Sequence, residues 1–455
     1  MDDAGSASRT AADVVRPVLE GALGAELPFR VRFWDGSAIG PEQAPATLVV
    51  ARRRALRRLL WAPDEIGLAR AYVTGDLDVE GDLTTLLDRI LQLIRPEGMV
   101  GGRPSLRTLA ALGRAALRLG VVGPPLRPPK EEIRLRGRRH TRRRDARAIA
   151  HHYDVGNEFY RLVLGDSMTY SCAYWAEAGF DITDPPDLSA AQFVKCDLVA
   201  RKLGLTPGMR VLDVGCGWGT FALHAARQYG VRVVGITLSA PQAEYARRRM
   251  SDAGVEELVE IRVQDYREVD DGPYDAIASI GMAEHVGSAK LAEYAADLYA
   301  QLRPEGRLLN HAISLRPDDP QQGPESSSFI DRYVFPDGEL VPIARMVATL
   351  EDAGFEVRDV ESLREHYALT LRAWATNLDR NWDAAVAAAT PVRARVWRLY
   401  MTAAALGFQA NDIGVNQVLA IRPGPRGQSG MPLTRARLLG FAAPPAAVRP
   451  ADDAR

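Results

Sequence analysis

The sequence predicts an α/β fold for residues 148–424, in which a parallel sheet is covered by helices on both faces. Apolar runs typical of buried strands alternate with amphipathic helical segments, and a glycine-rich turn follows the first of these runs. The expected strands lie near residues 209–214, 231–236, 258–263, 274–280, 306–313, 355–360 and 415–422. The expected helices lie near 217–229, 240–253, 288–302 and 341–353, and a mostly helical stretch covers 366–408.

Residues 1–122 predict a smaller α+β domain. Phe29–Trp34 followed by Asp35-Gly36 predicts a hairpin, and Ala46–Val50 predicts a further strand. Glycine–aspartate pairs on both sides of Leu77–Val79 indicate turns. Ser105–Gly120 predicts an amphipathic helix, because arginines fall on one side and leucines on the other.

Residues 123–147 predict a linker that is rich in proline and arginine. Between Arg127 and Arg147 there are ten basic residues and three acidic ones. Two interpretations stay open for this run: a solvated linker between domains, or a surface that meets anionic lipid headgroups. Residues 425–455 are rich in proline, alanine and arginine without periodicity, which predicts a flexible tail.

Composition excludes several classes of protein. The 455 residues carry a formal net charge of -1, so no global field favours nucleic acid as a partner. The three cysteines, Cys172, Cys196 and Cys216, have neither metal-ligand spacing nor a disulfide pattern, so no metal site is predicted. An acidic N-terminus without an apolar core segment, and the lack of a run of about 18 apolar residues, predict a cytoplasmic protein.

The turn after the first strand of the α/β part is the strongest motif. Val211–Thr220 contains Asp213 followed by glycines at 215, 217 and 219. A dinucleotide-binding turn would need glycine at position 220, where this chain has Thr220. The remaining pattern resembles the first motif of S-adenosylmethionine-dependent methyltransferases, in which backbone amides approach the cofactor.

Polar residues end the next strands. The second strand ends at Gly235–Ser239 without the acidic residue that often binds a ribose, so Gln242 is the candidate for that contact. Gln264, Asp265 and Tyr266 follow the third strand, where an amide, a carboxylate and an aromatic ring suit an adenine; core packing stays open for Tyr266.

Two ionisable residues are expected at the mouth of the same cleft. Glu284 follows the fourth strand and is adjacent to His285, and His311 lies at the end of the fifth strand. A buried carboxylate is costly unless it has a partner or a chemical role. The two strand ends together therefore indicate a reaction centre.

Six segments carry a specific resemblance to a known family. They resemble the cyclopropane-fatty-acyl-phospholipid synthase family, to which cyclopropane mycolic acid synthases are closely related. The N-terminal unit resembles the extra lipid-associated domain of the phospholipid-acting members. The segments are His152–Tyr160, Met168–Tyr174, Asp213–Gly219, Gly281–Gly287, Tyr333–Pro336 and His366–Trp374.

The resemblance implies a class I, Rossmann-like methyltransferase fold with a seven-stranded sheet and helical lipid-binding insertions. It also implies two sets of ligand-binding residues. S-adenosylmethionine would contact Tyr170, Ser171, Asp213, Gly215, Gly217, Trp218, Gly219, Thr237, Leu238, Ser239, Gln242, Gln264, Asp265 and Tyr266. A bicarbonate ion would contact Cys172, the Gly281 carbonyl, Glu284, His311, the Ile313 amide and Tyr367, of which Cys172, Glu284, His311 and Tyr367 would be catalytic.

The activity implied is transfer of a methylene group to the cis double bond of an unsaturated phospholipid acyl chain, through a carbocation that bicarbonate deprotonates. The N-terminal domain and basic linker would dock peripherally on the inner face of the membrane, and a homodimer is compatible with the resemblance. Ala283 stands where many members carry an aromatic residue, which affects the expected shape of the acyl channel.

Three alternatives stay open. The same site would give a methylene- or methyl-branched chain if the cation rearranged before it lost a proton. Alternatively, the protein would be a methyltransferase that acts on a small soluble molecule. A lipid-surface protein with an inactive methyltransferase domain is disfavoured, because the glycine turn, Glu284, His311 and Tyr367 are all present.

Overall fold

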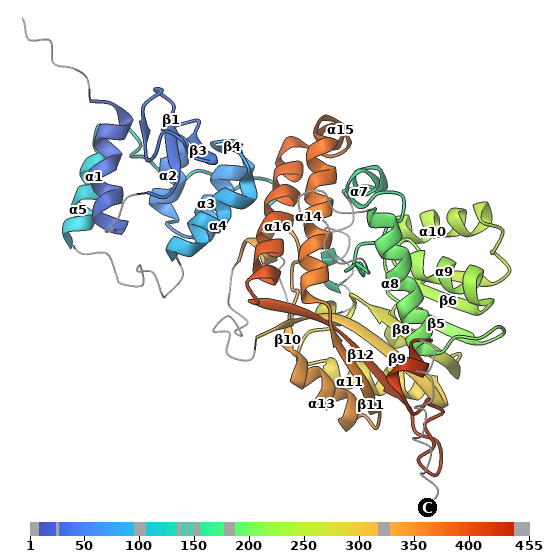
Figure 1. Cartoon of the computed structure of the whole chain (residues 1–455). Coiled ribbons are helices and arrows are strands. Elements are labelled where there is room, and N and C mark those ends of the chain that lie inside the picture. Colours follow the sequence, from blue (N-terminus) through green and yellow to red (C-terminus); the bar gives the residue numbers. More distant parts are fainter. Residues whose placement is uncertain are drawn as a thin grey trace, which may run out of the picture. The chain divides into compact units, whose positions relative to one another are not determined.

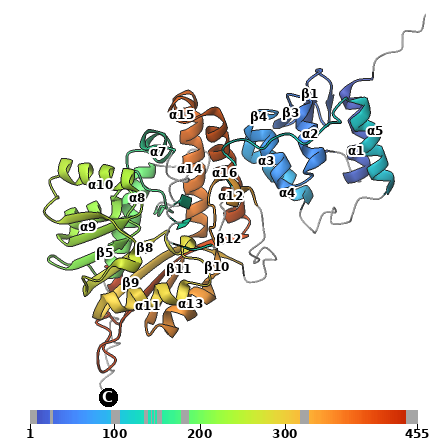
Figure 2. The same cartoon turned by 180° about the vertical axis from the view of Figure 1, so that it is seen from behind.

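A computed structural model describes residues 9–23, 27–94, 106–133, 139–141, 144, 145, 147, 148, 155–176, 187–316 and 328–440. Contacts divide the chain into two compact units. Figures 1 and 2 show the whole chain from opposite sides. The first unit contains Met1–Gly165, Asp319–Asp337 and Ala368–Asp412, and the second contains Asp166–Asp318, Gly338–Tyr367 and Ile413–Arg455. The helical stretch 368–412 therefore groups with the N-terminal residues, whereas we expected it within one domain over 148–424.

The second unit is built on an eight-stranded sheet with the order β11-β12-β9-β8-β5-β6-β7, and β10 pairs with β9. β12 runs antiparallel to β9 and β11, and the other pairs are parallel. The predicted strands are confirmed, and β10 is an addition too short for sequence periodicity to reveal. The strands are β5 (Arg210–Val214), β6 (Arg232–Thr237), β7 (Val259–Val263), β8 (Tyr274–Ile280), β9 (Leu302–Leu315), β10 (Val341–Pro342), β11 (Glu356–Ser362) and β12 (Ile413–Ile421).

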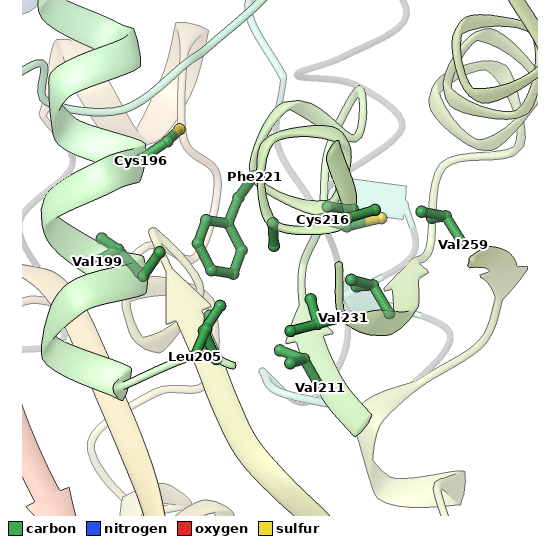
Figure 3. Packing of buried hydrophobic residues seen from close by; sticks show 14 of the residues in the cluster. Cys196, Val199, Leu205, Val211, Cys216, Phe221, Val231 and Val259 are labelled. Carbon is green, nitrogen blue, oxygen red and sulfur yellow. The ribbon is translucent and has the colours of Figure 1, made fainter. Parts of the chain in front are cut away.

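Helices cover both faces of this sheet, as predicted (Figure 1). Alternate residues of a strand point to opposite faces; Val211 of β5 therefore lies in one buried cluster and Leu212 in the other. Figure 3 shows Phe221 of the first cluster, with Val199 and Leu205 labelled beside it. One face carries α8 (Leu188–Leu203), α9 (Thr220–Tyr229) and α10 (Ala240–Asp252), and the other carries α11 (Leu291–Gln301) and α13 (Ile343–Asp352).

The carboxyl ends of β5, β6, β7, β8 and the parallel-paired part of β9 share one edge of the sheet. The short helices η2 (Tyr266–Glu268) and η3 (Ala283–His285) follow β7 and β8 there. The helix expected near residues 217–229 is confirmed as α9, which begins after the glycines of the turn, at Thr220. Gly217 and Gly219 have φ angles of 55° and 79°, which a right-handed helix does not accommodate.

The first unit contains a four-stranded sheet with the order β2-β1-β3-β4, which confirms the predicted hairpin and strand. Its strands are β1 (Arg30–Phe33), β2 (Ala38–Ile39), β3 (Ala46–Val50) and β4 (Leu77–Gly81). Its helices are α1 (Ala11–Leu23), α2 (Arg54–Trp61), α3 (Glu65–Val73), α4 (Leu83–Ile94), α5 (Leu106–Arg118), α7 (Asn157–Leu164), α12 (Phe329–Tyr333), α15 (Trp382–Ala388), α16 (Pro391–Gln409) and most of α14 (Arg364–Arg380).

The described part of the basic segment is held by ion pairs within the first unit. Arg144 Nη2 lies 2.6 Å from Asp337 Oδ1, and only 11% of the Arg144 side chain is exposed. Glu132, in the same segment, lies 2.7 Å from Arg70 and 2.8 Å from Arg332. Arg144 is therefore an internal partner of Asp337 and not a free lipid-facing cation; Arg142 and Arg143 lie outside the described residues.

The predicted tail begins with a stretch that is bonded to other residues of the second unit. Arg307 Nη2 donates to the Gly430 carbonyl at 3.0 Å, and Arg201 Nη1 donates to the Leu439 carbonyl at 3.1 Å. The short helix α17 (Arg435–Leu438) lies in this stretch. Residues 441–455 lie outside the described part of the chain.

Candidate active site

The turn between β5 and α9 is anchored to β6, because the Gly215 and Cys216 amides both donate to the Ile236 carbonyl at 3.0 and 2.9 Å. A Cβ on Gly217 would meet nothing within 4 Å. A Cβ on Gly219 would lie 2.7 Å from Met250 Cε of α10. Gly217 thus leaves open space above the turn, whereas Gly219 permits close helix packing. Trp218 between them is buried.

The segment before α8 lies against a buried lysine that sequence analysis did not identify. Lys195 Nζ donates to Ser171 Oγ at 3.1 Å, and Gln192 donates to the Ser171 carbonyl at 2.9 Å. Burial raises the pKa of Asp213, at the end of β5, to about 7, although the charge of Lys195 opposes the shift. Polar residues at helical spacing on the buried face of α8 were the available signal. Tyr170, next to Ser171, is half-buried.

The residues predicted after β6 bond to one another. Thr237 Oγ1 donates to Gln242 Oε1 at 3.0 Å, which orients the Gln242 amide. The Ser239 hydroxyl caps α10 by accepting from the backbone N–H of Gln242. Leu238, between Thr237 and Ser239, is half-buried. This arrangement holds Gln242 at the carboxyl edge of the sheet, where a ribose contact was predicted.

The residues predicted after β7 already have protein partners. The Asp265 carboxylate caps η2 and lies 2.6 Å from Arg267 Nη2. Gln264 donates to the Glu268 carbonyl at 2.9 Å. Tyr266 packs edge-on against Tyr294 with ring centroids 5.5 Å apart. These contacts fix the segment, and its polar groups are less free for an adenine than the sequence indicated.

Glu284 is partly buried, and its carboxylate has one bonded oxygen and one buried oxygen without a bond. Its Oε1 accepts from the Ile313 amide at 2.8 Å, and Oε2 has no hydrogen-bond partner among the described residues. Burial raises its pKa to about 7. The Glu339 amide donates to the Glu284 carbonyl at 3.0 Å and fastens η3.

His311 lies on β9, two residues before Ile313 and therefore on the same face of the strand. Its carbonyl accepts from the Gly281 amide at 2.8 Å. Burial, with the positive charges of Lys195 and Lys202, lowers its pKa to about 3. Its Nδ1 lies 3.3 Å from Gln417 Nε2, and its Nε2 is without a partner among the residues that the structure describes.

Hydrogen bonds join the predicted anion ligands into two groups, and the role predicted for the Ile313 amide is different in the structure. Gly281, Glu284, His311 and Ile313 form the first group. The Ile313 amide was expected to bind the anion, but it donates to Glu284, because a buried carboxylate requires a donor. In the second group, Leu363 links Cys172 and Tyr367: Cys172 Sγ lies 3.7 Å from its carbonyl, and the Tyr367 amide donates to the same oxygen at 3.0 Å.

The contacts of His366 with two aromatic residues were not predicted. Trp175 is held twice by His366: its amide donates to Nδ1 at 3.0 Å, and its Nε1 donates to the carbonyl at 3.1 Å. Tyr174 stacks on the same imidazole at 4.6 Å. Ala283, the departure from the family pattern, belongs to the buried apolar cluster that packs α11 and α13 on the sheet.

Residues 140–418 match the family model described as mycolic acid cyclopropane synthetase. The chain belongs to this family. It is 42% identical over 417 residues to the Probable fatty acid methyltransferase Rv3720 of Mycobacterium tuberculosis, covering 89% of this chain and 94% of that protein. It is 37% identical over 271 residues to the Cyclopropane-fatty-acyl-phospholipid synthase of Escherichia coli (strain K12), covering 60% and 66% of the two chains.

A solved structure of the mycolic acid cyclopropane synthase CmaA1 complexed with SAH and CTAB resembles the chain with a TM-score of 0.56. The sequences are 32% identical, and the match covers 61% of this chain and 98% of that one. The chain is therefore an S-adenosylmethionine-dependent methyltransferase with the predicted fold. The open space at Gly217 fits this cofactor.

The two turn glycines provide a matched pair of variants. Alanine at either position adopts an unfavourable positive φ, so backbone strain is common to both. We expect Gly217→Ala to weaken SAH binding by about tenfold or more, ~1.4 kcal/mol, with little further loss of stability. Gly219→Ala should instead lower stability by about 1–3 kcal/mol through overpacking against Met250. Calorimetric titration with SAH and thermal unfolding check both; unchanged binding in Gly217→Ala would contradict the cofactor assignment.

The raised pKa of Glu284 predicts that this carboxyl group lowers the folding stability of the protein at neutral and higher pH. The folded protein holds this proton up to a pKa of about 7, against the ordinary 4.5, so folding stability falls as pH rises between those values. Glu284→Gln removes this loss and should unfold at a higher temperature than the unaltered protein at pH 8, with a gap that shrinks toward pH 5. Exposed Glu256→Gln is the control. A gap that grows toward pH 5 would contradict the assignment.

Proposed function

We propose that this methyltransferase adds a methylene bridge across the cis double bond of unsaturated acyl chains in membrane phospholipids, giving cyclopropane fatty acids, with bicarbonate bound beside the reacting carbon. One observation carries the proposal: Glu284 Oε2 and His311 Nε2 are buried and without hydrogen-bond partners among the described residues. One is an acceptor and the other is available as a donor, which fits a small oxyanion that carries its own proton.

The chemistry explains why such groups are needed. An isolated alkene is a weak nucleophile, and its attack on a sulfonium methyl leaves a cation that water would convert to an alcohol. When bound, S-adenosylmethionine supplies the electrophilic methyl group, and bicarbonate supplies a base for the proton lost as the ring closes. Glu284, held by the Ile313 amide, would orient the proton of the anion, while neutral His311 would donate to its oxygen. Cys172 and Tyr367 would complete the ligand set.

A branched product is the second candidate. The Mycobacterium tuberculosis relative Rv3720, of which 94% is covered by the match, is named a probable fatty acid methyltransferase. That name does not specify a cyclopropane ring as the product. A hydride shift before proton loss would give a methylene branch from the same cation and the same site. The two products have equal mass, so the test must distinguish ring from branch by fragmentation.

Lipid analysis tests the activity directly. Purified protein, methyl-labelled S-adenosylmethionine and vesicles of dioleoyl phospholipid should yield acyl chains with one labelled added carbon, detected by mass spectrometry. Glu284→Gln and His311→Ala should abolish product while SAH affinity stays nearly unchanged, because neither side chain is expected to hold the cofactor. Full turnover in either variant would refute the anion site. Methylation of a soluble amine, with none of the lipid, would refute the lipid substrate.

We further propose that the first unit docks on anionic phospholipid. An exposed apolar patch, the α2–α5 patch, lies at α2 and the end of α5 and consists of Leu60, Trp61, Leu117 and Val122. Trp61 Nε1 donates to the Gly123 carbonyl at 2.8 Å, which holds the indole beside Val122. Residues 52–61 and 106–127 carry arginines and no acidic residue. Arg52, Arg54 and Arg58 contact the buried carboxylate of Asp76, which offsets one of these positive charges. Apolar side chains amid positive charge suit an anionic bilayer surface. None of the described helices is long and apolar enough to traverse a bilayer.

Substitutions in the α2–α5 patch check the docking surface. Trp61→Ser with Leu117→Ser should weaken binding to phosphatidylglycerol-containing vesicles by about 1 kcal/mol or more per side chain, because each loses apolar area that enters the membrane. Co-sedimentation measures the change. Leu433→Ser, at a residue that is 97% exposed in the second unit, is the control. Equal binding of the double variant and the control would exclude this patch as the docking surface.

A further inference from the structure

Lys202, in the last turn of α8, is a charged side chain with no exposed surface. Its Nζ contacts the carboxylate of Glu361, lies 3.4 Å from Asp359 Oδ2 and donates to Gln417 Oε1 at 2.9 Å. A buried ammonium group is costly unless opposite charges surround it, and the two carboxylates of β11 provide them. The proposed reaction makes no direct use of this lysine, so its third contact, with Gln417, calls for an explanation.

Gln417 lies in a row of side chains that crosses three strands. Glu361 of β11 pairs with Gln417 of β12, and Gln417 pairs with His311 of β9, so these residues are direct cross-strand neighbours. Lys202 has three donor hydrogens and no acceptor, which requires the Gln417 amide to turn its oxygen toward the lysine. The amide nitrogen therefore faces His311 Nδ1, at 3.3 Å.

This contact determines which nitrogen of the His311 ring carries the hydrogen. Nδ1 faces an N–H group and must accept, so in the neutral ring the hydrogen is on Nε2. Burial and the charges of Lys195 and Lys202 lower the His311 pKa to about 3, which keeps the ring neutral near pH 7. Nε2 has no hydrogen-bond partner among the described residues, so its N–H group is available to donate to a ligand.

We propose that Lys202 and Gln417 are positioning residues that fix His311 in its Nε2–H tautomer, so that the ring presents a donor to the bound anion. The inference rests on the proposed function, because that function places an anion against His311. In the opposite tautomer, a lone pair on Nε2 would repel the anion. A charged imidazolium would donate as well, but it would also supply a proton to a basic anion. A neutral ring with hydrogen on Nε2 binds the anion and leaves it basic.

A purely structural role for the same ion cluster makes a different prediction. If Lys202 served only to neutralise Asp359 and Glu361, its removal would lower stability without changing the tautomer of His311. The tautomer is therefore the deciding measurement, and it can be made on the protein without substrate.

The test uses the full chain with nitrogen-15 in its histidine rings and long-range proton–nitrogen correlation spectra, in which the two tautomers give different patterns. His311→Ala identifies the resonances of interest, and we expect the Nε2–H pattern in the unaltered protein. Lys202→Met should release the Gln417 amide and allow the Nδ1–H form. Lys290→Met, the same change at a lysine whose side chain is 42% exposed, should leave the pattern unchanged.

Gln417→Glu is the second variant, because it keeps an oxygen for Lys202 but places an acceptor against Nδ1. It should give the Nδ1–H form or a charged ring, and Lys202→Arg should retain Nε2–H. In Lys202→Met and Gln417→Glu, product formation should fall by about tenfold or more, ~1.4 kcal/mol, with SAH affinity unchanged.

An Nδ1–H ring in the unaltered protein would overturn the proposal. An Nε2–H ring that persists in Gln417→Glu, or in folded Lys202→Met, would overturn it as well. If Lys202→Met does not fold, Gln417→Glu alone decides. Failure of the proposed function has a different signature: the expected tautomers in all variants, in a protein that makes no product from unsaturated lipid.

Discussion

The separation of Glu284 Oε2 and His311 Nε2 from water is the constraint on which the candidate site depends. Loss of hydration favours the neutral form of each group, which raises the pKa of Glu284 to about 7 and lowers that of His311 to about 3. Each group retains one protein hydrogen bond, from Ile313 and Gln417 respectively. Without water to screen them, both act on a ligand more strongly than they would in solution.

The sheet supplies the rigidity that such a site requires. β9 is bonded to β8 on one side and to β12 on the other, and β10 pairs with its last residues. These ladders fix the backbone of residues 311–313, so that His311 and Ile313 face the same way. Apolar clusters on both faces of the sheet hold the helices in place. α8, which packs on one of these faces, contributes the two buried lysines, Lys195 and Lys202. A small movement of β9 would disturb both ionisable groups together.

Sequence periodicity predicted the strands and most helices of the second unit, because alternation and helical spacing are local properties. The start of α9 at Thr220 was not predicted to the residue, because the φ angles of Gly217 and Gly219 are not visible in the sequence. The row from Glu361 through Gln417 to His311 was missed because cross-strand register joins residues that are far apart in the chain. Arg144 looked like a surface cation, and only tertiary structure reveals Asp337 beside it.

The division of the chain has a practical consequence for protein engineering. The first unit is assembled from three separate stretches, Met1–Gly165, Asp319–Asp337 and Ala368–Asp412, interleaved with those of the second. Deleting the first 165 residues would remove one stretch and leave the other two behind without the sheet β1–β4 on which that unit is built. Neither unit can therefore be obtained as a fragment by cutting the gene at a single position, and hybrids between relatives would need exchanges at several junctions.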